Sequence, residues 1–342
     1  MAVSTIDPNG LNVGQFGNRN LIINGDFSIS QRSTSVTGAT SSGYATVDRW
    51  WHNASGGTQN MSQQSLAVGQ TDLPSQFTKF FRFASTSGNN NQGFAQKIEN
   101  VELLSGTTVT VSFYAKGTNP GAGSVELAYL QYFGSGGSAN VEAAPYNITL
   151  TSSWQLFKTT ISLPSVSGKT VGAGNSTYVY FRQGASDTST AAWTMDVTGV
   201  QVEVSPTGEA TPFEHRSYGD ELQKCMRYYY QIGDGTGFGS AQSGSGGNAY
   251  LWAYPFRHPV PMRAAPTLSL ISGGSTYFVG GIGVTIGTPT GDLGTVNTST
   301  MAIQSDGKTT VAIHRLGING FSFTRGMGYG GTSGFIHCDA EL

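Results

Sequence analysis

The chain has 342 residues, and only 11% of them are charged, against roughly 25% in an ordinary soluble domain. The formal net charge is −2, without a basic stripe or an acidic tail, which excludes the electrostatic footprint of a nucleic-acid-binding protein. Glycine accounts for 48 residues, and Thr, Val, Tyr and Phe are plentiful. This composition predicts an all-β protein with short strands and glycine-rich turns. Its neutral surface suits sugar ligands or tight assembly, although a merely solvated β surface fits it equally well.

No apolar run reaches the about 18 residues that a transmembrane helix needs, so we expect no membrane insertion. The segment Met1–Pro8 has neither the basic nor the apolar region of a secretory signal peptide, so we expect no signal peptide. Cys225 and Cys338 lie far apart in the sequence. Free, buried thiols are therefore a better prediction than a disulfide.

Residues 1–20 combine three glycines and four asparagines with little apolar periodicity. This pattern predicts an extended N-terminal arm. Two interpretations remain open: the arm is a disordered tail, or it becomes ordered only against a partner.

Residues 21–213 are predicted to form a first β-sandwich or jelly-roll module. An apolar run at 21–23 leads into an Asn-Gly-Asp turn at 24–26. Apolar and polar residues alternate at 109–116 and again at 157–163, which is the period of a strand with one buried face. The alternation changes parity at Gly199, which predicts a β-bulge there.

Residues 214–230 are predicted to be a short helical linker. The helix itself is expected over Ser217–Tyr230, with acidic residues in its first turn and four apolar residues on one face, namely Leu222, Cys225, Met226 and Tyr229. A helix of about three turns is too short to stand alone, so it must pack on a module. It can pass into a strand at residues 228–230.

Residues 231–342 are predicted to form a second β-sandwich. A Gly/Ser-rich loop at 235–247 is followed by alternating aromatics at 250–254, which Pro255 interrupts. The proline-rich segment 258–266 cannot be helical. Later strands are predicted at 277–279, 284–286, 310–314 and 320–324.

No catalytic residue is predicted. None of the five histidines lies at metal-ligand spacing with another histidine or a cysteine. Neither a nucleophile elbow nor a phosphate-binding loop occurs in its required context. Glu99 and Glu102 have no aromatic platform between them and do not stand out as a glycosidase pair. We therefore expect a binding or structural protein and not an enzyme.

The tryptophans supply the candidate ligand-binding residue. Trp193 and Phe113 alternate with polar residues and are expected in the core. Trp50 and Trp51 are adjacent on a strand, so at most one of them can face the core. We assign Trp50 to the core and Trp51 to an exposed or interfacial position, where its ring can stack on sugar C–H groups.

Four stretches of the first module resemble the galactose-binding-like jelly roll of carbohydrate-binding modules: Asn-Gly-Asp-Phe at 24–27, Asp-Arg-Trp at 48–50, the strand at 110–116, and Met-Asp-Val-Thr-Gly-Val-Gln-Val-Glu at 195–203. The resemblance implies a structural calcium ion that ties the first strand to the last. Its matching ligands are Asp26 or Ser28, together with Asp196. Serine stands at position 28 where that family usually has an acid, and Asp26 alternatively serves as a turn-forming residue.

The junction Ala-Thr-Pro-Phe-Glu-His-Arg-Ser-Tyr at 210–218, continuing to Tyr229, resembles a segment of tailed-bacteriophage structural proteins, and so does Pro-Met-Arg-Ala-Ala-Pro-Thr at 261–267. This resemblance implies a virion protein that is assembled in the host cytoplasm. It further implies a homotrimer, contacts with other virion proteins through residues 1–20, and adsorption to host-surface polysaccharide.

Three functions are therefore considered. The first is a tail fibre, spike or head fibre that binds a host-surface glycan. The second is a purely structural connector or decoration protein without a ligand. The third is a polysaccharide depolymerase, which the absence of a short β-helix repeat disfavours.

Overall fold

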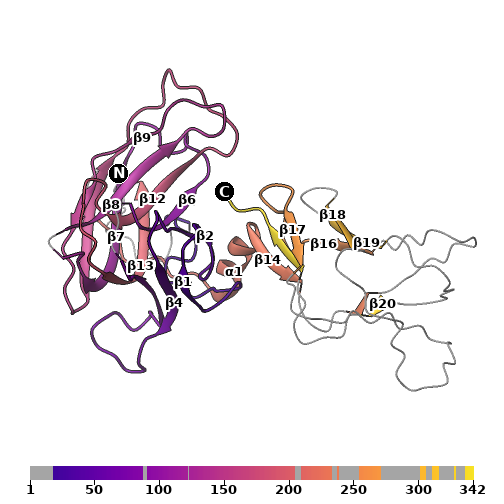
Figure 1. Ribbon diagram of the computed structural model, residues 1–342, viewed down its shortest axis with the longest axis horizontal. Coiled ribbons are helices and arrows are strands. Elements are labelled where there is room, and N and C mark those ends of the chain that lie inside the picture. Colours follow the sequence, from indigo (N-terminus) through magenta and orange to yellow (C-terminus); the bar gives the residue numbers. More distant parts are fainter. Residues whose placement is uncertain are drawn as a thin grey trace, which may run out of the picture. The chain divides into compact units, whose positions relative to one another are not determined.

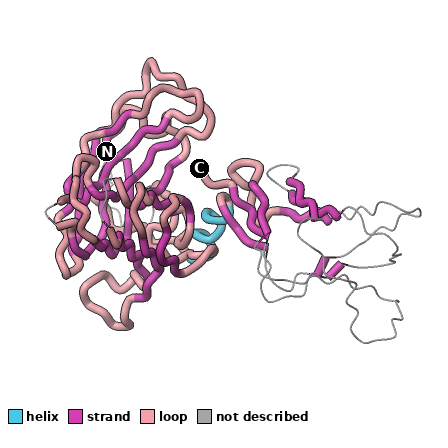
Figure 2. The backbone as a smooth tube through the Cα atoms, viewed as in Figure 1, coloured by secondary structure: helices cyan, strands magenta, loops and turns pink. Residues whose placement is uncertain are grey.

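The computed structural model describes residues 18–87, 91–121, 123–204, 209–232, 237–238, 254–270, 301–305, 310–315, 327–328 and 336–342. The chain divides into two compact units, Met1–Leu222 with Leu342, and Gln223–Glu341. Strands make up almost all the regular structure of the described residues, beside a single short helix (Figure 2). The predicted all-β fold is thus confirmed. No helix in these ranges is long and apolar enough to cross a membrane.

The first unit is a sandwich of two antiparallel sheets (Figure 1). Sheet one has the order β1 (Ser35–Ala39), β4 (Gln59–Ser65), β5 (Lys79–Ser85), β13 (Trp193–Val204), β7 (Thr108–Thr118) and β11 (Gln155–Ser162). Sheet two has the order β10 (Tyr146–Ile148), β8 (Val125–Tyr132), β12 (Ser176–Gln183), β6 (Gly93–Ile98), β3 (Trp50–Asn53) and β2 (Gly43–Tyr44), with β9 (Val141–Glu142) beside β8.

The core lies between these two sheets and is rich in aromatic rings. Trp193 and Phe113 are fully buried, and Trp50 is 2% exposed, as the sequence predicts. The Trp50 ring lies 4.9 Å from that of Phe27, and its indole Nε1 donates to the carbonyl of Asn24 at 3.0 Å. The Asn-Gly-Asp-Phe turn is therefore fastened directly to the core.

Strand β13 contains the predicted bulge. Its register against β7 shifts between Thr198 and Gln201, and Gly199 has a φ of +64°. That left-handed conformation favours glycine. A Cβ atom at this position would also lie 2.6 Å from Cζ of Phe77. The bulge is confirmed, and both the backbone and the neighbouring ring require glycine there.

The N-terminal segment 20–25 lies along β13 beyond the point where β5 stops pairing at Val197. The Leu21 amide donates to the Val202 carbonyl, and the Val200 amide donates to the Gly25 carbonyl, each at 2.9 Å. The side chain of Asn20 bonds to both backbone neighbours, the Val200 carbonyl and the Val202 amide, at 3.0 Å. The start of the module is thereby bonded to its last strand.

Three side chains that follow the sandwich, Glu214, Arg216 and Glu221, form what we term the junction clamp. The Glu214 carboxylate accepts hydrogen bonds from the backbone amides of Asn18 and Asn20. Arg216 pairs with Glu221 at 3.2 Å and with Glu214 at 3.5 Å, and it donates to the Ile22 carbonyl at 3.0 Å. All three side chains are at least nine-tenths buried. The junction therefore holds residues 18–22 in place, whereas the remainder of the predicted arm, residues 1–17, lies outside the described residues.

The helix α1 spans Tyr218–Met226, which is shorter than the predicted Ser217–Tyr230. Ser217 caps it, because its Oγ accepts from the Asp220 amide at 3.2 Å. The helix ends at Met226, and the passage into a strand that the sequence allows at 228–230 is confirmed by β14 (Tyr229–Ile232). The aromatic, sheet-favouring run at 228–230 explains this outcome. The division between the two units falls inside α1, after Leu222.

The second unit is also built from antiparallel strands in its described part. Its sheets have the orders β14–β21 (Ile336–Asp339)–β17 (Thr267–Leu270), β16 (Tyr254–Arg257)–β19 (Thr310–Arg315)–β18 (Met301–Ser305), and β15 (Gly237–Phe238)–β20 (Met327–Gly328). Pro255 does not end its strand as predicted. It lies within β16 at the edge of a sheet, where a missing N–H is tolerated.

The remaining predictions for the second unit have mixed outcomes. The strand at 310–314 is confirmed, whereas those predicted at 277–279, 284–286 and 320–324 lie outside the described residues. Cys225 and Cys338 are both buried and are not joined in a disulfide, as predicted. Burial raises the pKa of the Cys338 thiol to about 11, so this thiol is protonated and unreactive at neutral pH.

A candidate ligand-binding face on the first unit

The alternation of β3 places Trp50 and Trp51 on opposite faces of sheet two. Trp50 enters the core, and Trp51 lies half-buried on the outer face. The strand register then brings Ala95 of β6 beside Trp51, and Tyr180 of β12 beside Ala95. Tyr180 in turn lies opposite Ala128 of β8. Residues from four strands therefore share this outer face.

Four aromatic side chains on this face, Trp51, Tyr132, Tyr178 and Tyr180, form what we term the aromatic platform. The rings of Trp51 and Tyr178 are stacked with centroids 6.2 Å apart, and those of Tyr132 and Tyr178 are stacked at 6.1 Å. Tyr180 meets Trp51 edge-on at 6.4 Å. Ala95 and Ala128 are fully buried beneath this cluster. Their small side chains leave room for a continuous aromatic surface above the sheet.

Lys97 organises one end of the platform. Its Nζ lies 5.0 Å from the Trp51 ring centroid, 5.2 Å from that of Tyr178 and 5.7 Å from that of Tyr44. An ammonium over a ring is attracted by the negative π face, and three such contacts fix the rings relative to one another. The cation therefore holds the platform in shape.

Hydrogen bonds and burial fix the two central tyrosines. The Tyr180 hydroxyl accepts from Nδ2 of Asn53 at 2.7 Å and donates to the carbonyl of Asn91, and burial raises the pKa of this phenol. Burial, followed by the nearby Tyr132, raises the pKa of Tyr178 to about 12. Both phenols are thus neutral at ordinary pH, and the Tyr180 hydroxyl is engaged within the protein.

The other end of the platform is charged. Arg182 pairs with Glu142 at 2.5 Å and with Glu126 at 3.4 Å, and its guanidinium lies 5.6 Å from the centre of the Tyr180 ring. Its side chain is 5% exposed, whereas that of Glu142 is 32% exposed. The guanidinium is therefore engaged internally, and the Glu142 carboxylate is the polar group that this end presents to solvent.

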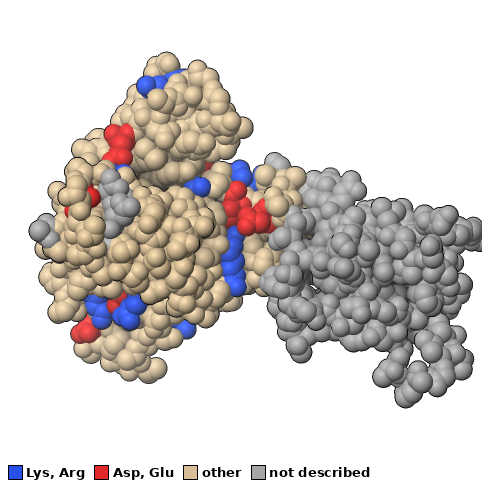
Figure 3. All heavy atoms as spheres, viewed as in Figure 1, with Lys and Arg blue, Asp and Glu red and all other residues tan. Residues whose placement is uncertain are grey.

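The platform is thus a fixed, mainly aromatic cluster with polar groups at its margins, in which Trp51, Tyr132 and Tyr178 are half-buried and Tyr180 is 5% exposed. Charged side chains are few and gathered in small groups on the face of the first unit seen in Figure 3. Such a surface can stack on the C–H face of a ring while hydroxyl, amide and carboxylate groups bind the ring's own hydroxyls. The chemistry available is recognition of a polyhydroxylated ring.

The three candidate calcium ligands have other partners. Oδ1 of Asp26 accepts from the backbone amide and the hydroxyl of Ser28 at 3.2 and 2.9 Å, which is the turn-forming role considered for it. Asp196 forms a bidentate pair with Arg82 at 2.7 and 2.8 Å. Within the described ranges, no group of three or more His, Cys, Asp or Glu side chains is placed to hold a metal ion. The calcium ion stays a prediction.

The sequence singled out Trp51 but not its neighbours on the platform. Tyr178 and Tyr180 do carry a signal, because they alternate with Val179 and Phe181, so both faces of β12 are apolar or aromatic. An aromatic row opposite a core row on an inner strand indicates a functional face. That Trp51 and Tyr132 lie beside Tyr178 and Tyr180 follows only from the order of the strands in the sheet.

No protein-family model matches the chain, and no curated protein matches it either. Among solved structures, the enzymatically active domain of bacteriophage CBA120 tailspike protein 4 is 14% identical, with a TM-score of 0.31, over 55% of this chain and 22% of its own. This chain therefore spans about a fifth of that tailspike chain.

Two carbohydrate-binding modules match this chain with similarly low sequence identities and TM-scores. A CBM4 structure is 18% identical, with a TM-score of 0.27, over 37% of this chain and 84% of its own. The C-terminal family 22 module of Clostridium thermocellum Xyn10B is 14% identical, with a TM-score of 0.31, over 46% of this chain and 87% of its own. Because all these scores and identities are low, they assign neither a family nor a ligand to this chain.

Proposed function

We propose that this protein is a phage virion component of the fibre or spike type, whose first unit binds host-surface polysaccharide without catalysis. The observation that carries the binding role is the aromatic platform. Trp51, Tyr178 and Tyr180 contribute nothing to the core between the sheets, yet packing, hydrogen bonds and Lys97 hold their rings in place. A pre-arranged aromatic surface loses little entropy on binding a ligand.

The virion role is supported by the resemblance of residues 210–229 and 261–267 to tailed-phage structural proteins. In this proposal the protein is a homotrimer, and residues 1–20 attach it to other virion proteins. Mass photometry of the whole protein tests whether it is a homotrimer. A species of three chains is expected, and a monomer at all concentrations would contradict the trimer.

The binding role is tested by Trp51→Ala in the full chain, with affinity for host polysaccharide measured by isothermal titration calorimetry. Loss of a central aromatic anchor is expected to weaken binding at least about tenfold, because such anchors contribute on the order of 2 kcal/mol. Trp154→Ala is the matched control, since Trp154 packs against Phe80 away from the platform. Equal affinity of the two variants would overturn the assignment of the platform. Release of reducing ends by the wild-type protein would show that it is instead a depolymerase.

A purely structural role is the second candidate, and the junction clamp favours it, because the clamp fixes the base of the arm at Asn18 and Asn20. Deletion of residues 1–17 leaves every clamp contact in place. Loss of incorporation into particles, with polysaccharide binding unchanged, is expected if the arm is the attachment. Unchanged incorporation would contradict that role.

A further inference from the structure

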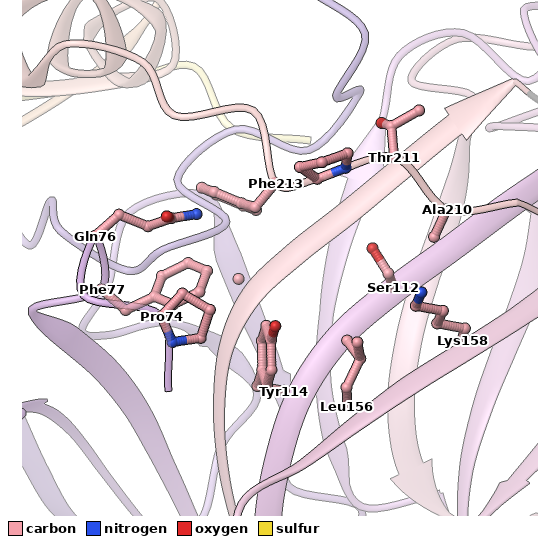
Figure 4. A pocket seen from close by; sticks show the side chains of 12 residues that line it. Pro74, Gln76, Phe77, Ser112, Tyr114, Leu156, Lys158, Ala210, Thr211 and Phe213 are labelled. Carbon is pink, nitrogen blue, oxygen red and sulfur yellow. The ribbon is translucent and has the colours of Figure 1, made fainter. Parts of the chain in front are cut away.

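A cavity of about 330 Å³ lies on the outer face of sheet one (Figure 4). Because the platform lies on the outer face of sheet two, the two are on opposite sides of the sandwich. The strand register builds its floor. Leu156 of β11 lies opposite Tyr114 of β7, which lies opposite Thr198 beside the bulge of β13. Its volume is near the lower end of the roughly 300–1,000 Å³ typical of small-molecule sites. The cavity can hold a ligand the size of one or two sugar rings.

The walls of the cavity are apolar and aromatic. Phe77 meets Tyr114 edge-on at 5.6 Å and Phe213 at 5.1 Å, and Pro74 lies beside them. Leu156 is 45% exposed although it projects into this space. Large apolar side chains left in contact with solvent inside a cavity favour a ligand that covers them.

The polar groups of the cavity converge from neighbouring strands. Ser112 and Lys158 are cross-strand partners, so their side chains leave the sheet on the same face (Figure 4). The Ser112 side chain is 6% exposed. Neither its hydroxyl nor the Lys158 ammonium has a hydrogen-bond or ion-pair partner in the described part of the chain. A hydroxyl that reaches a cavity without a protein partner binds water or a ligand there.

The charge of the lining selects the ligand. Lys158 is the one charged side chain among the residues that line the cavity as described, and no carboxylate accompanies it. Glu203 lies nearby in β13, and its carboxylate accepts hydrogen bonds from the amide and the hydroxyl of Thr211, both at 2.8 Å. A cation beside a hydroxyl and an aromatic wall suits a ring that carries a carboxylate, hydroxyls and an apolar face.

We propose that this cavity is a second binding site, specific for an acidic sugar unit of the uronic acid type. The Lys158 ammonium binds the carboxylate, the Ser112 hydroxyl binds a ring hydroxyl, and the ring packs against Tyr114 and Leu156. This site is separate from the platform and does not require the platform to bind neutral sugar.

The test uses the full-length Trp51→Ala protein, which lacks the tryptophan ring of the platform. A galacturonic acid trisaccharide and its methyl ester are titrated into it by calorimetry, and the contact residues are mapped by amide NMR shifts. We expect the acid to bind with shifts at Ser112 and Tyr114, and the ester to bind at least about tenfold more weakly, because charge-assisted hydrogen bonds are the strong ones.

Three substitutions at exposed positions complete the test. Lys158→Gln removes the charge and Leu156→Trp fills the cavity, and both are expected to weaken binding of the acid about tenfold or more. Lys169→Gln, on an exposed turn, is the matched control and is expected to change nothing. Equal binding of acid and ester, shifts away from the cavity, or full affinity in Lys158→Gln or Leu156→Trp would each overturn the proposal. Failure of neutral polysaccharide binding in the wild-type protein would instead count against the platform alone.

Discussion

His52 is a titratable residue inside the apolar core of the first unit. It is 3% exposed, and its Nδ1 lies 2.9 Å from Oε1 of Gln59. Because an amide oxygen is an acceptor only, this nitrogen carries the proton of the neutral ring. Burial lowers the pKa of His52 below its usual 6.5, against the opposing effect of the Gln59 bond. The folded protein therefore favours the uncharged imidazole.

This shift predicts acid sensitivity. The unfolded chain takes up the proton first, so the stabilising effect of a neutral His52 is complete above about pH 6.5 and is lost as the pH falls toward the lower pKa of the folded state. The melting temperature should decrease between pH 7.5 and pH 5. The decrease should be smaller in His52→Gln, which cannot titrate. Equal decreases in both proteins would show that other groups cause the sensitivity.

The position of single residues was predictable where one strand determines it. Trp50 and Trp51 follow from alternation alone, and Gly199 follows from the change of parity along β13. Ser112 and Lys158 were not predicted as a pair, because their proximity depends on the register between β7 and β11. No pattern within either strand indicates that register.

The strand β13 is the central element of sheet one, and several segments are fastened to it. Its first half pairs with β5 and β7, and its second half bonds to residues 20–25 and to β7. The junction then returns along it, where the Glu214 amide donates to Oε1 of Gln201 at 2.7 Å. Contacts between positions nearly 200 residues apart can be seen only in the fold. Composition alone predicts a linker at residues 214–230.

The clamp predicts a specific effect of Arg216→Ala. The change leaves the carboxylates of Glu214 and Glu221 buried without their cation, which should destabilise the first unit by on the order of 3 kcal/mol. Amide hydrogen exchange at Asn20 and Asn24 should accelerate more than exchange in β7. Arg216→Lys, which keeps the charge but not the paired donors, should have an intermediate effect. Uniform acceleration throughout the sandwich would contradict a local clamp.

At the scale of the whole molecule, the first unit has a hydrophobic core of its own and a C-terminal boundary that differs from the predicted one. The sequence predicts the end of the module at residue 213, whereas the compact unit extends to Leu222. The difference comprises the whole junction clamp. A domain boundary drawn from composition misses such a segment, because its few polar residues act through long-range contacts.

Two truncated proteins test this boundary. Residues 18–226 should fold cooperatively, because they keep both sheets, the clamp and α1. Residues 18–213 should melt at a lower temperature, by roughly 5 °C or more for the loss of a few kcal/mol in a unit of this size. Circular dichroism and calorimetry measure both. Equal melting temperatures would show that the clamp contributes nothing to the stability of the unit.

The clamp also determines how the first unit would carry tension. Asn18 and Asn24, near the start of the described chain, are joined by direct hydrogen bonds to Glu214 and Glu221 of the junction. A pull applied between Asn18 and α1 is therefore borne by these contacts and not across the strands of sheet two. The rings of the platform, which lie on sheet two, would therefore keep their spacing under load.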